Sequence, residues 1–243
     1  MENKLVLKKT HDYSATKSPK LVVVFIHGIA SDSSTFEHTL NYLEGLKSMN
    51  DVRFVTFDLL GSGKSLASDE LNYSYSEQIE ALHSSIDKLK IGDTPLVLVG
   101  HSMGTMIVTR FADTYKNSVR QLVLVSPPIY SEKDFKHPAF EAGIKVFKDA
   151  VAIKNRQILD EKAFNNSMEK IILNKRNYAV LAGIKTHAVI IYGALDQFIA
   201  SYNIPGIMKL NPNISAIKTE GRHGVTRDKY TKIADVIEEV LHA

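Results

Sequence analysis

The stretch from Leu96 to Thr114 constrains the fold of this chain more than any other. It begins with Leu96 to Val99, an apolar run of Val and Leu that is typical of a strand buried on both faces of a sheet. The sequence Gly-His-Ser-Met-Gly follows at positions 100–104, with Ser102 at its centre. After it, apolar residues recur at helical spacing, namely Ile107, Val108, Phe111 and Tyr115. The pattern predicts a strand that turns sharply into a helix, with one serine at the turn.

Gly100 and Gly104 flank Ser102 because a turn this tight requires glycine at both positions. The geometry of such a turn explains the requirement. The turn brings the backbone on either side of Ser102 close to neighbouring segments, where a side chain at either glycine would collide. We expect the turn to strain Ser102 and to lift its hydroxyl clear of the sheet. The helix that starts at Met103 directs free N–H groups and the positive end of its dipole to the same place. A glycine-rich turn with a solvated serine is the alternative, but the strand before it and the helix after it favour a nucleophile.

Apolar segments with strand character recur along the rest of the chain and alternate with helical patterns. They predict a doubly wound α/β fold, a mostly parallel sheet of seven to eight strands with helices on both faces. We expect an edge strand at Leu5–Lys9 and a polar loop at Asp12–Pro19. Ser74 and Glu77 form a capping box that should begin a helix. The other predicted strands lie at residues 21–26, 52–57, 121–125, 188–192 and 215–219.

This alternation is interrupted between residues 130 and 186, where no strand pattern occurs. The segment has a helical character, with apolar side chains among many lysines. We expect a small helical lid at 130–186, inserted into an α/β core that comprises 1–129 and 187–243. The apolar lid residues could line a substrate pocket or only pack the lid onto the body, and its lysines fit a solvated helix face better than an anion site.

Composition and motif spacing argue against several other functions. The formal charge of +3 is too small to indicate binding to nucleic acid or to an anionic membrane, and the absence of cysteine excludes disulfides and thiolate chemistry. No apolar run approaches the ~20 residues of a membrane span, and the start lacks a signal-peptide pattern, so we expect a soluble, cytoplasmic protein. The sequence 61–65 ends like a phosphate-binding loop, but Asp58 stands where that loop needs a glycine. No metal-ligand spacing occurs, so we expect no metal.

A serine hydroxyl is a weak nucleophile that needs a base, and the base needs an orienting acid. In this type of fold both should follow later strands, in the order Ser, Asp or Glu, His. Asp196 and His223 each stand just past a predicted strand and close to glycine. Among nine histidines, only His223 has both the order and the placement. His101 is next to the serine, and we expect it to point away from it.

The acid has alternative assignments. An aspartate in a loop of this kind could serve only an Asx-turn, which is the structural alternative for Asp196. Asp134 and Asp149 in the predicted lid are rivals if the acid has moved there. The sequence alone leaves these alternatives open.

The segment His27-Gly28-Ile29 follows the predicted strand at 21–26, which should lie beside the strand that carries Ser102. The backbone N–H of Ile29, with that of Met103, could hold a developing oxyanion. We expect Gly28 and the ring of His27 to shape this turn, with the ring bonded to loop backbone rather than taking part in chemistry.

In combination, these segments resemble the α/β-hydrolase superfamily, in its lidded serine esterase and lipase-like branch. The resemblance implies a sheet of eight strands or slightly fewer, Ser-His-Asp catalysis and no cofactor. The amino terminus is short for the family, so a first strand could be missing, and Thr105 replaces a second glycine that is common after the serine. The matching segments, which span residues 20 to 225, are His27-Gly28, the Asp58-x-x-Gly61-x-Gly63-x-Ser65 loop, Gly100 to Gly104, and Asp196 with His223.

We therefore expect a serine hydrolase that cleaves carboxylic esters of small to medium, partly apolar substrates. The serine argues against haloalkane dehalogenases and epoxide hydrolases, which carry aspartate at this turn. A carbon–carbon bond hydrolase, a lactonase or a thioesterase with the same triad remains open. So does a regulatory protein that keeps the triad and uses the pocket to sense a ligand. The expected partner is a small-molecule substrate, and no oligomeric state can be assigned.

Overall fold

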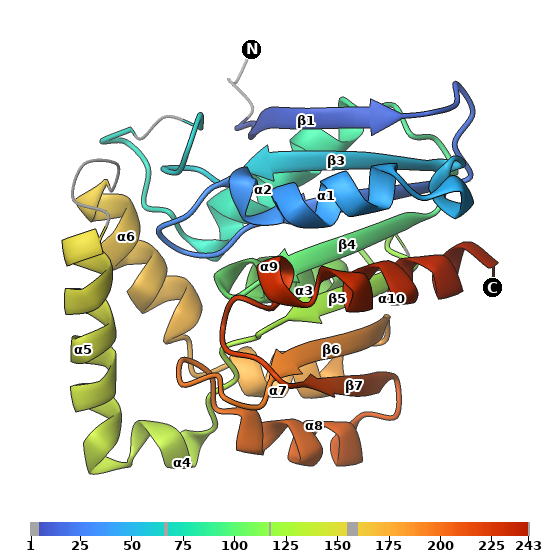
Figure 1. The fold of residues 1–243 in the computed structure, drawn as a ribbon. Coiled ribbons are helices and arrows are strands. Elements are labelled where there is room, and N and C mark those ends of the chain that lie inside the picture. Colours follow the sequence, from blue (N-terminus) through green and yellow to red (C-terminus); the bar gives the residue numbers. More distant parts are fainter. Residues whose placement is uncertain (1–4, 66–67, 117, 155–159, 243) are drawn as a thin grey trace.

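A single seven-stranded sheet forms the centre of the computed structural model, which describes residues 5–65, 68–116, 118–154 and 160–242 (Figure 1). The strand order is β1-β3-β2-β4-β5-β6-β7, and every neighbouring pair is parallel except β1 with β3. The predicted doubly wound, mostly parallel sheet of seven to eight strands is confirmed, with seven. The strands are β1 (Lys8–Ser14), β2 (Leu21–Ile26), β3 (Val52–Asp58), β4 (Leu96–His101), β5 (Gln121–Val125), β6 (His187–Gly193) and β7 (Ile214–Thr219).

Helices cover both faces of the sheet, and each face has its own apolar core. One core joins the sheet to α2 (Tyr75–Asp87), α3 (Met103–Thr114) and α8 (Ile204–Leu210). The other joins it to α1 (Glu37–Glu44), α9 (Val225–Asp228) and α10 (Tyr230–His242), seen in front of the sheet in Figure 1. Strand β2 is buried along its whole length, as its run of apolar residues predicts. This winding brings the carboxyl ends of the parallel strands to one edge.

A local sequence signal correctly predicts where helix α2 begins. Ser74 caps α2, and the Glu77 side chain accepts the N–H of Ser74 at 2.8 Å, completing the predicted capping box. Helix α2 ends at Asp87, and Lys90 then adopts a φ of 53°.

The first strand differs from the prediction. Strand β1 begins at Lys8 and runs to Ser14, so the first part of the segment expected to be a loop is in the sheet. It lies at the sheet edge, where most of its side chains are solvated, and the alternation that would reveal a half-buried strand is therefore weak. The guanidinium of Arg53 on β3 donates to both carboxylate oxygens of Asp12, at 2.8 and 2.9 Å, which holds the polar edge in place.

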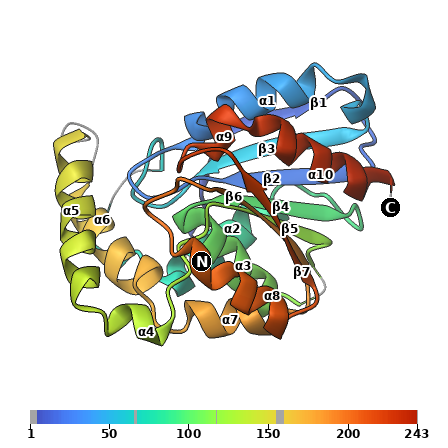
Figure 2. The same ribbon diagram turned by 60° about the horizontal axis from the view of Figure 1, so that its bottom comes forward.

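The insertion between β5 and β6 consists of helices. They are α4 (Glu132–Phe135), α5 (Pro138–Lys154), α6 (Glu161–Ser167), a π-helical turn η3 (Met168–Ile172) and α7 (Asn177–Gly183). Helices α4, α5 and α6 stand beyond the carboxyl ends of the parallel strands, whereas α7 lies beside α3 and α8 (Figure 2). Residues 155–159 of the predicted lid, and 1–4 and 243 of the predicted core, lie outside the described residues.

Candidate active site

The turn between β4 and α3 holds Ser102 in a strained backbone conformation. Its φ of 51° and ψ of −120° lie outside the regions that residues other than glycine normally adopt. The Ser102 N–H donates to the carbonyl of Val125 on β5 at 2.8 Å, which fixes the turn to the sheet. A Cβ at Gly104 would lie 2.2 Å from the Ile26 carbonyl oxygen, and one at Gly100 would lie 2.6 Å from the backbone of α3. Both glycines are thus required by close packing.

Thr105, at the position where the resemblance leads one to expect glycine, supports the same turn. Its hydroxyl donates to the Ser102 carbonyl at 2.5 Å, and its N–H donates to the same oxygen at 3.0 Å. The side chain is fully buried. The departure from the family pattern therefore stiffens the helix start behind the serine.

An imidazole and a carboxylate meet beyond the ends of β6 and β7. Nδ1 of His223 lies 2.8 Å from Oδ2 of Asp196, and the Phe198 N–H donates to the other carboxylate oxygen at 2.9 Å. Burial by itself raises the pKa of Asp196, but the hydrogen bond and charge of His223, with the Phe198 N–H, lower that pKa below its usual value. Asp196 is therefore ionised at neutral pH and accepts the Nδ1 proton. This tautomer leaves Nε2 of His223 with a lone pair.

The loops that carry these two residues approach each other at a pair of glycines. A Cβ at Gly193 would lie 2.3 Å from the carbonyl oxygen of Gly221. Only glycine permits this approach, which brings the loop after β6 against the loop after β7. The sequence showed glycines near both residues, but their mutual contact becomes visible only in the fold.

His101, which we expect to point away from Ser102, contacts the backbone of His223. Its Nε2–H donates to the backbone carbonyl of His223 at 3.0 Å, and the two rings lie 5.0 Å apart. Burial, followed by the nearby positive charge that His223 can carry, lowers the pKa of His101 to about 3, so its ring is neutral. Within the described residues its Nδ1 is buried without a hydrogen-bond partner. The contact spans 122 positions in sequence, and no local pattern indicates it.

His27 connects two loops at the same edge of the sheet. Its Nδ1–H donates to the Gly28 carbonyl at 2.7 Å, and its Nε2 accepts the Leu59 N–H at 2.9 Å. The ring is fully buried, and this burial lowers its pKa, so it remains neutral. Its nitrogens are both occupied by backbone groups, which leaves it no proton to exchange with a substrate.

Two backbone N–H groups lie beside Ser102 without an acceptor. Met103 is the first residue of α3, and a first-turn N–H has no partner within its helix. The turn before Ile29 passes directly over the serine, since a Cβ at Gly28 would lie 3.0 Å from the Ser102 Cβ. In the part of the chain that the structure describes, neither the Ile29 nor the Met103 N–H makes a hydrogen bond. These two groups can receive an oxyanion that forms next to Ser102.

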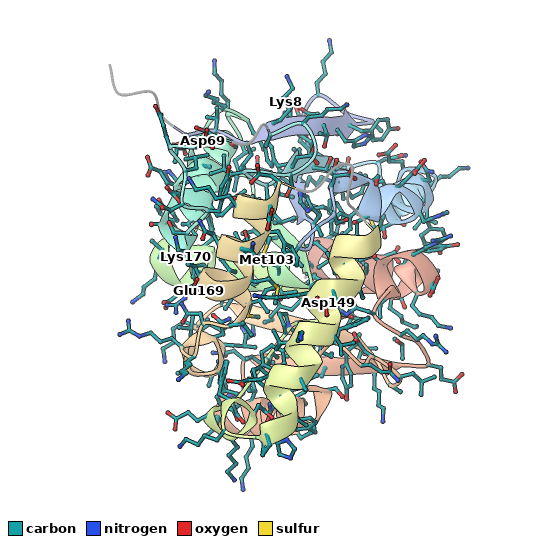
Figure 3. The ribbon with its side chains drawn as sticks, turned by 90° about the vertical axis from the view of Figure 1, so that its left-hand side faces the viewer. Lys8, Asp69, Met103, Asp149, Glu169 and Lys170 are labelled. Carbon is teal, nitrogen blue, oxygen red and sulfur yellow. The ribbon has the colours of Figure 1, made fainter. Side chains whose placement is uncertain are left out.

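The rival carboxylates of the insertion have other surroundings. Asp134 is buried and accepts hydrogen bonds from the N–H and hydroxyl of Ser131, from Asn203 and from the Tyr202 hydroxyl. Asp149 is exposed on α5. Figure 3 views the molecule from the side of this helix, with Met103 at the start of α3 behind α5 and α6. Neither aspartate has a hydrogen bond to His223 among the described residues.

The described ranges contain no group of three or more His, Asp or Glu side chains that could hold a metal ion. Within the same ranges, no helix combines the length and the apolar character needed to cross a bilayer.

The fold and the site define a class of protein: a doubly wound α/β protein with a serine at a strand-to-helix turn and a His–Asp pair beyond the later strands. The family model described as alpha/beta hydrolase fold matches residues 22–147. This chain belongs to that family.

Individual proteins and solved structures that are similar to this chain agree with its membership of this family. The protein named probable lysophospholipase BODYGUARD 5, from Arabidopsis thaliana, is 33% identical over 122 residues, which cover 50% of this chain and 27% of that protein. The chain therefore spans only about a quarter of the length of this relative. Among solved structures, a carboxylesterase of the archaeon Nitrososphaera gargenis has a TM-score of 0.73 at 16% identity and covers 96% of this chain and 94% of its own. MenH from S. aureus has a TM-score of 0.71 at 19% identity, with 95% and 98% covered. At these identities the structures show the fold alone.

Proposed function

We propose that this protein is a serine hydrolase that cleaves carboxylic esters through an acyl-enzyme on Ser102. The observation that carries the proposal is the 2.8 Å contact between His223 and Asp196, because the imidazole it orients lines the same cavity as the strained serine. Asp196 holds the proton on Nδ1, so Nε2 is available as a base. A serine with such a partner can attack an acyl carbon at neutral pH.

In the first half of the reaction Ser102 Oγ forms a bond to the ester carbonyl carbon while Nε2 of His223 takes the hydroxyl proton. The N–H groups of Ile29 and Met103 stabilise the negative charge on the carbonyl oxygen. The tetrahedral intermediate then expels the alcohol, which receives the proton from His223. Asp196 stabilises the imidazolium in the meantime.

In the second half a water molecule attacks the acyl-enzyme, and His223 again serves as the base. The proton returns to Ser102 Oγ as the carboxylic acid leaves. The neutral rings of His27 and His101 take no part in these proton transfers. Both ring nitrogens of His27 are hydrogen-bonded to backbone groups, and His101 has a pKa of about 3.

Helices α4, α5 and α6 act, in this proposal, as the lid. Phe147 of α5 lines the cavities over Ser102, so this helix forms part of the wall that a substrate meets. Exclusion of bulk water by such a wall strengthens the electrostatic interactions around the oxyanion.

Esters are favoured over other acyl compounds by the kinds of protein that share this sequence. Relatives that match about half of the chain carry the names probable lysophospholipase and protein phosphatase methylesterase, the latter from Candida albicans at 26% identity. Both names describe cleavage of a carboxylic ester. The carbon–carbon, lactone and thioester reactions use the same catalytic groups, and a substrate assay separates them.

The test is hydrolysis of chromogenic esters, from acetate to long acyl chains, by the wild type and Ser102→Ala. We expect wild-type turnover and a loss of about 10⁴-fold or more in the variant, with an unchanged circular dichroism spectrum and melting temperature. Full activity in Ser102→Ala would disprove the nucleophile. A folded wild type without turnover across the series would reject ester hydrolysis and favour another acyl substrate or a ligand-sensing role.

A further inference from the structure

Two cavities meet over Ser102. One has a volume of about 240 Å³ and lies between α5, the loop after β5 and the loop after β6; we call it the acyl cavity. The other has a volume of about 450 Å³ and lies along the turn after β2; we call it the polar cavity. Both are lined by Ser102, His223, Phe147 and Phe198. A substrate attacked by Ser102 therefore has two different spaces for its two halves.

The partition between the cavities is an aromatic pair. The ring of Phe147 on α5 lies 5.4 Å from that of Phe198, and the ring of Phe198 lies 5.4 Å from that of His223, both with edge-to-face geometry. The backbone of Phe198 is fixed on both sides, because its N–H binds Asp196 and its carbonyl accepts the Tyr130 hydroxyl at 2.9 Å. Phe198 is thus a wall whose position is set by the catalytic acid itself.

The acyl cavity is mainly apolar and has the size of a ring. A cavity of roughly 150 Å³ holds one benzene molecule, so about 240 Å³ accommodates a ring with a few further carbon atoms. Gly143 on α5 is exposed and lines this space, and no atom lies within 4 Å of a Cβ built there. The apolar side chains that line it include Tyr130, Phe140, Ile144, Phe147, Met168 and Ile172.

The polar cavity also has apolar walls, such as Val151 and Phe198, but it differs from the acyl cavity in having an acidic side chain and a cluster of serines. Ser31, Asp32 and Ser34 line it beside the backbone of the turn that carries Ile29. Burial raises the pKa of Asp32, but hydrogen bonds from Ser34 and the nearby charge of Lys64 outweigh it and lower that pKa, so the carboxylate is ionised at neutral pH. Lys64 lines a neighbouring cavity that Asp32 also lines, but it does not line the polar cavity itself. Hydroxyl groups and a cation suit this lining, whereas an anion does not.

Resting on the proposed ester hydrolysis, we propose that the substrate joins a compact, ring-sized apolar acid to an alcohol that is cationic or rich in hydroxyl groups. The acyl half occupies the acyl cavity, because it stays bonded to Ser102 until water arrives and gains from an apolar enclosure. The alcohol leaves first and occupies the larger polar cavity. An alcohol that carries a phosphate group is disfavoured by Asp32.

The acyl half is tested with Gly143→Leu, which fills the acyl cavity. Gly183→Leu, on α7 and also without atoms within 4 Å of a Cβ, is the matched control. With p-nitrophenyl acetate and p-nitrophenyl phenylacetate as probes, we expect Gly143→Leu to lower kcat/KM for phenylacetate by about tenfold or more and for acetate by less than about twofold. The control should change neither. Equal effects on both esters, or no effect, would overturn the acyl assignment.

The alcohol half is tested with phenylacetyl choline and phenylacetyl glycerol phosphate. We expect the wild type to prefer the choline ester, and Asp32→Asn to lower that preference by about fivefold, the size of one partly exposed charge pair. Asparagine keeps the acceptor oxygen for Ser34 and removes only the charge. A preference that is unchanged in Asp32→Asn, or a wild type that prefers the phosphate ester, would overturn the alcohol assignment.

Ser102→Ala separates this inference from the function on which it rests. If turnover depends on Ser102 but its substrate preferences are the same in Gly143→Leu and Asp32→Asn, the two-cavity assignment is wrong and the proposed hydrolase function stands. Absence of any turnover that depends on Ser102 rejects both.

Discussion

The two oxygens of the Asp196 carboxylate have different partners: Oδ2 lies 2.8 Å from Nδ1 of His223, and Oδ1 accepts the Phe198 N–H at 2.9 Å. The side chain of Asp196 is fully shielded from solvent. One oxygen therefore orients the imidazole, while the other fixes the loop that forms the wall of the cavity. Asp196 therefore determines both the orientation of the His223 ring and the position of the cavity wall.

Asp196→Asn should lower kcat by the order of 10⁴-fold while the protein remains folded. The amide can donate to Nδ1, which favours the tautomer with the proton on Nε2 and removes the base. The measurement is steady-state ester hydrolysis together with thermal unfolding. A variant with more than about a tenth of wild-type kcat would show that another group orients His223.

His101→Ala should lower kcat by about two- to tenfold with little change in KM. The change removes one hydrogen bond, from Nε2 to the His223 carbonyl, and a ring that lines the polar cavity, while the acyl cavity keeps its lining. His101→Gln retains an N–H donor and should recover part of the loss. Glutamine and alanine variants with the same kcat would show that packing, rather than this hydrogen bond, accounts for the effect.

Asp134→Asn should destabilise the protein in a pH-dependent way. The carboxylate links α4 to the segment after β6 through Asn203 and Tyr202. Burial raises its pKa, but hydrogen bonds from Tyr202, Ser131 and Asn203 lower it below its usual value. A depressed folded-state pKa stabilises the protein above the unfolded pKa of about 3.9, and this contribution is lost as the pH falls through the folded pKa.

Urea denaturation of this variant at several pH values is the appropriate measurement. We expect Asp134→Asn to lose about 2 kcal/mol of unfolding free energy at pH 7, and the difference from wild type to narrow below about pH 4. Asp149→Asn, at an exposed position on α5, serves as the control and should change stability by less than about 0.5 kcal/mol. A difference that is constant with pH would contradict the charge-based account.

Two glycine-to-alanine substitutions should have opposite effects on the free energy of unfolding. Gly104→Ala places a methyl group 2.2 Å from the Ile26 carbonyl oxygen and should cost about 1–3 kcal/mol or more, with loss of activity. Gly143→Ala adds a methyl group to a helix in open space and should stabilise by roughly 0.5–1 kcal/mol. Calorimetric melting of the two variants provides the comparison, and equal melting temperatures would show that the turn at Ser102 can relax.

Much of the fold follows from local patterns. The buried run before Ser102 and the capping box at Ser74 are encoded within a few residues, and these elements are found where the sequence predicts them. The alternation of strands and helices then determines the sheet, because parallel strands need crossover connections. The order Ser, Asp, His along the chain is also a sequence property, and the structure brings Asp196 and His223 into contact.

Other features arise only from contacts between distant segments. The carbonyl of His223 that His101 binds, and the carbonyl of Gly221 against Gly193, lie on loops whose approach depends on the whole sheet. Strand β1 is held by pairing with β3 rather than by its own polar sequence. The two cavities depend on the placement of α5, which no periodicity in the chain predicts.

The measurement that tests the central claim most directly is covalent labelling with an alkyl fluorophosphonate, followed by peptide mass spectrometry. The account predicts one label per chain, attached to Ser102, formed at the same rate at which ester hydrolysis is lost. Asp196→Asn should slow the labelling strongly, because the serine then lacks its base. Labelling at another residue, or complete loss of hydrolysis while Ser102 remains unmodified, would contradict the account.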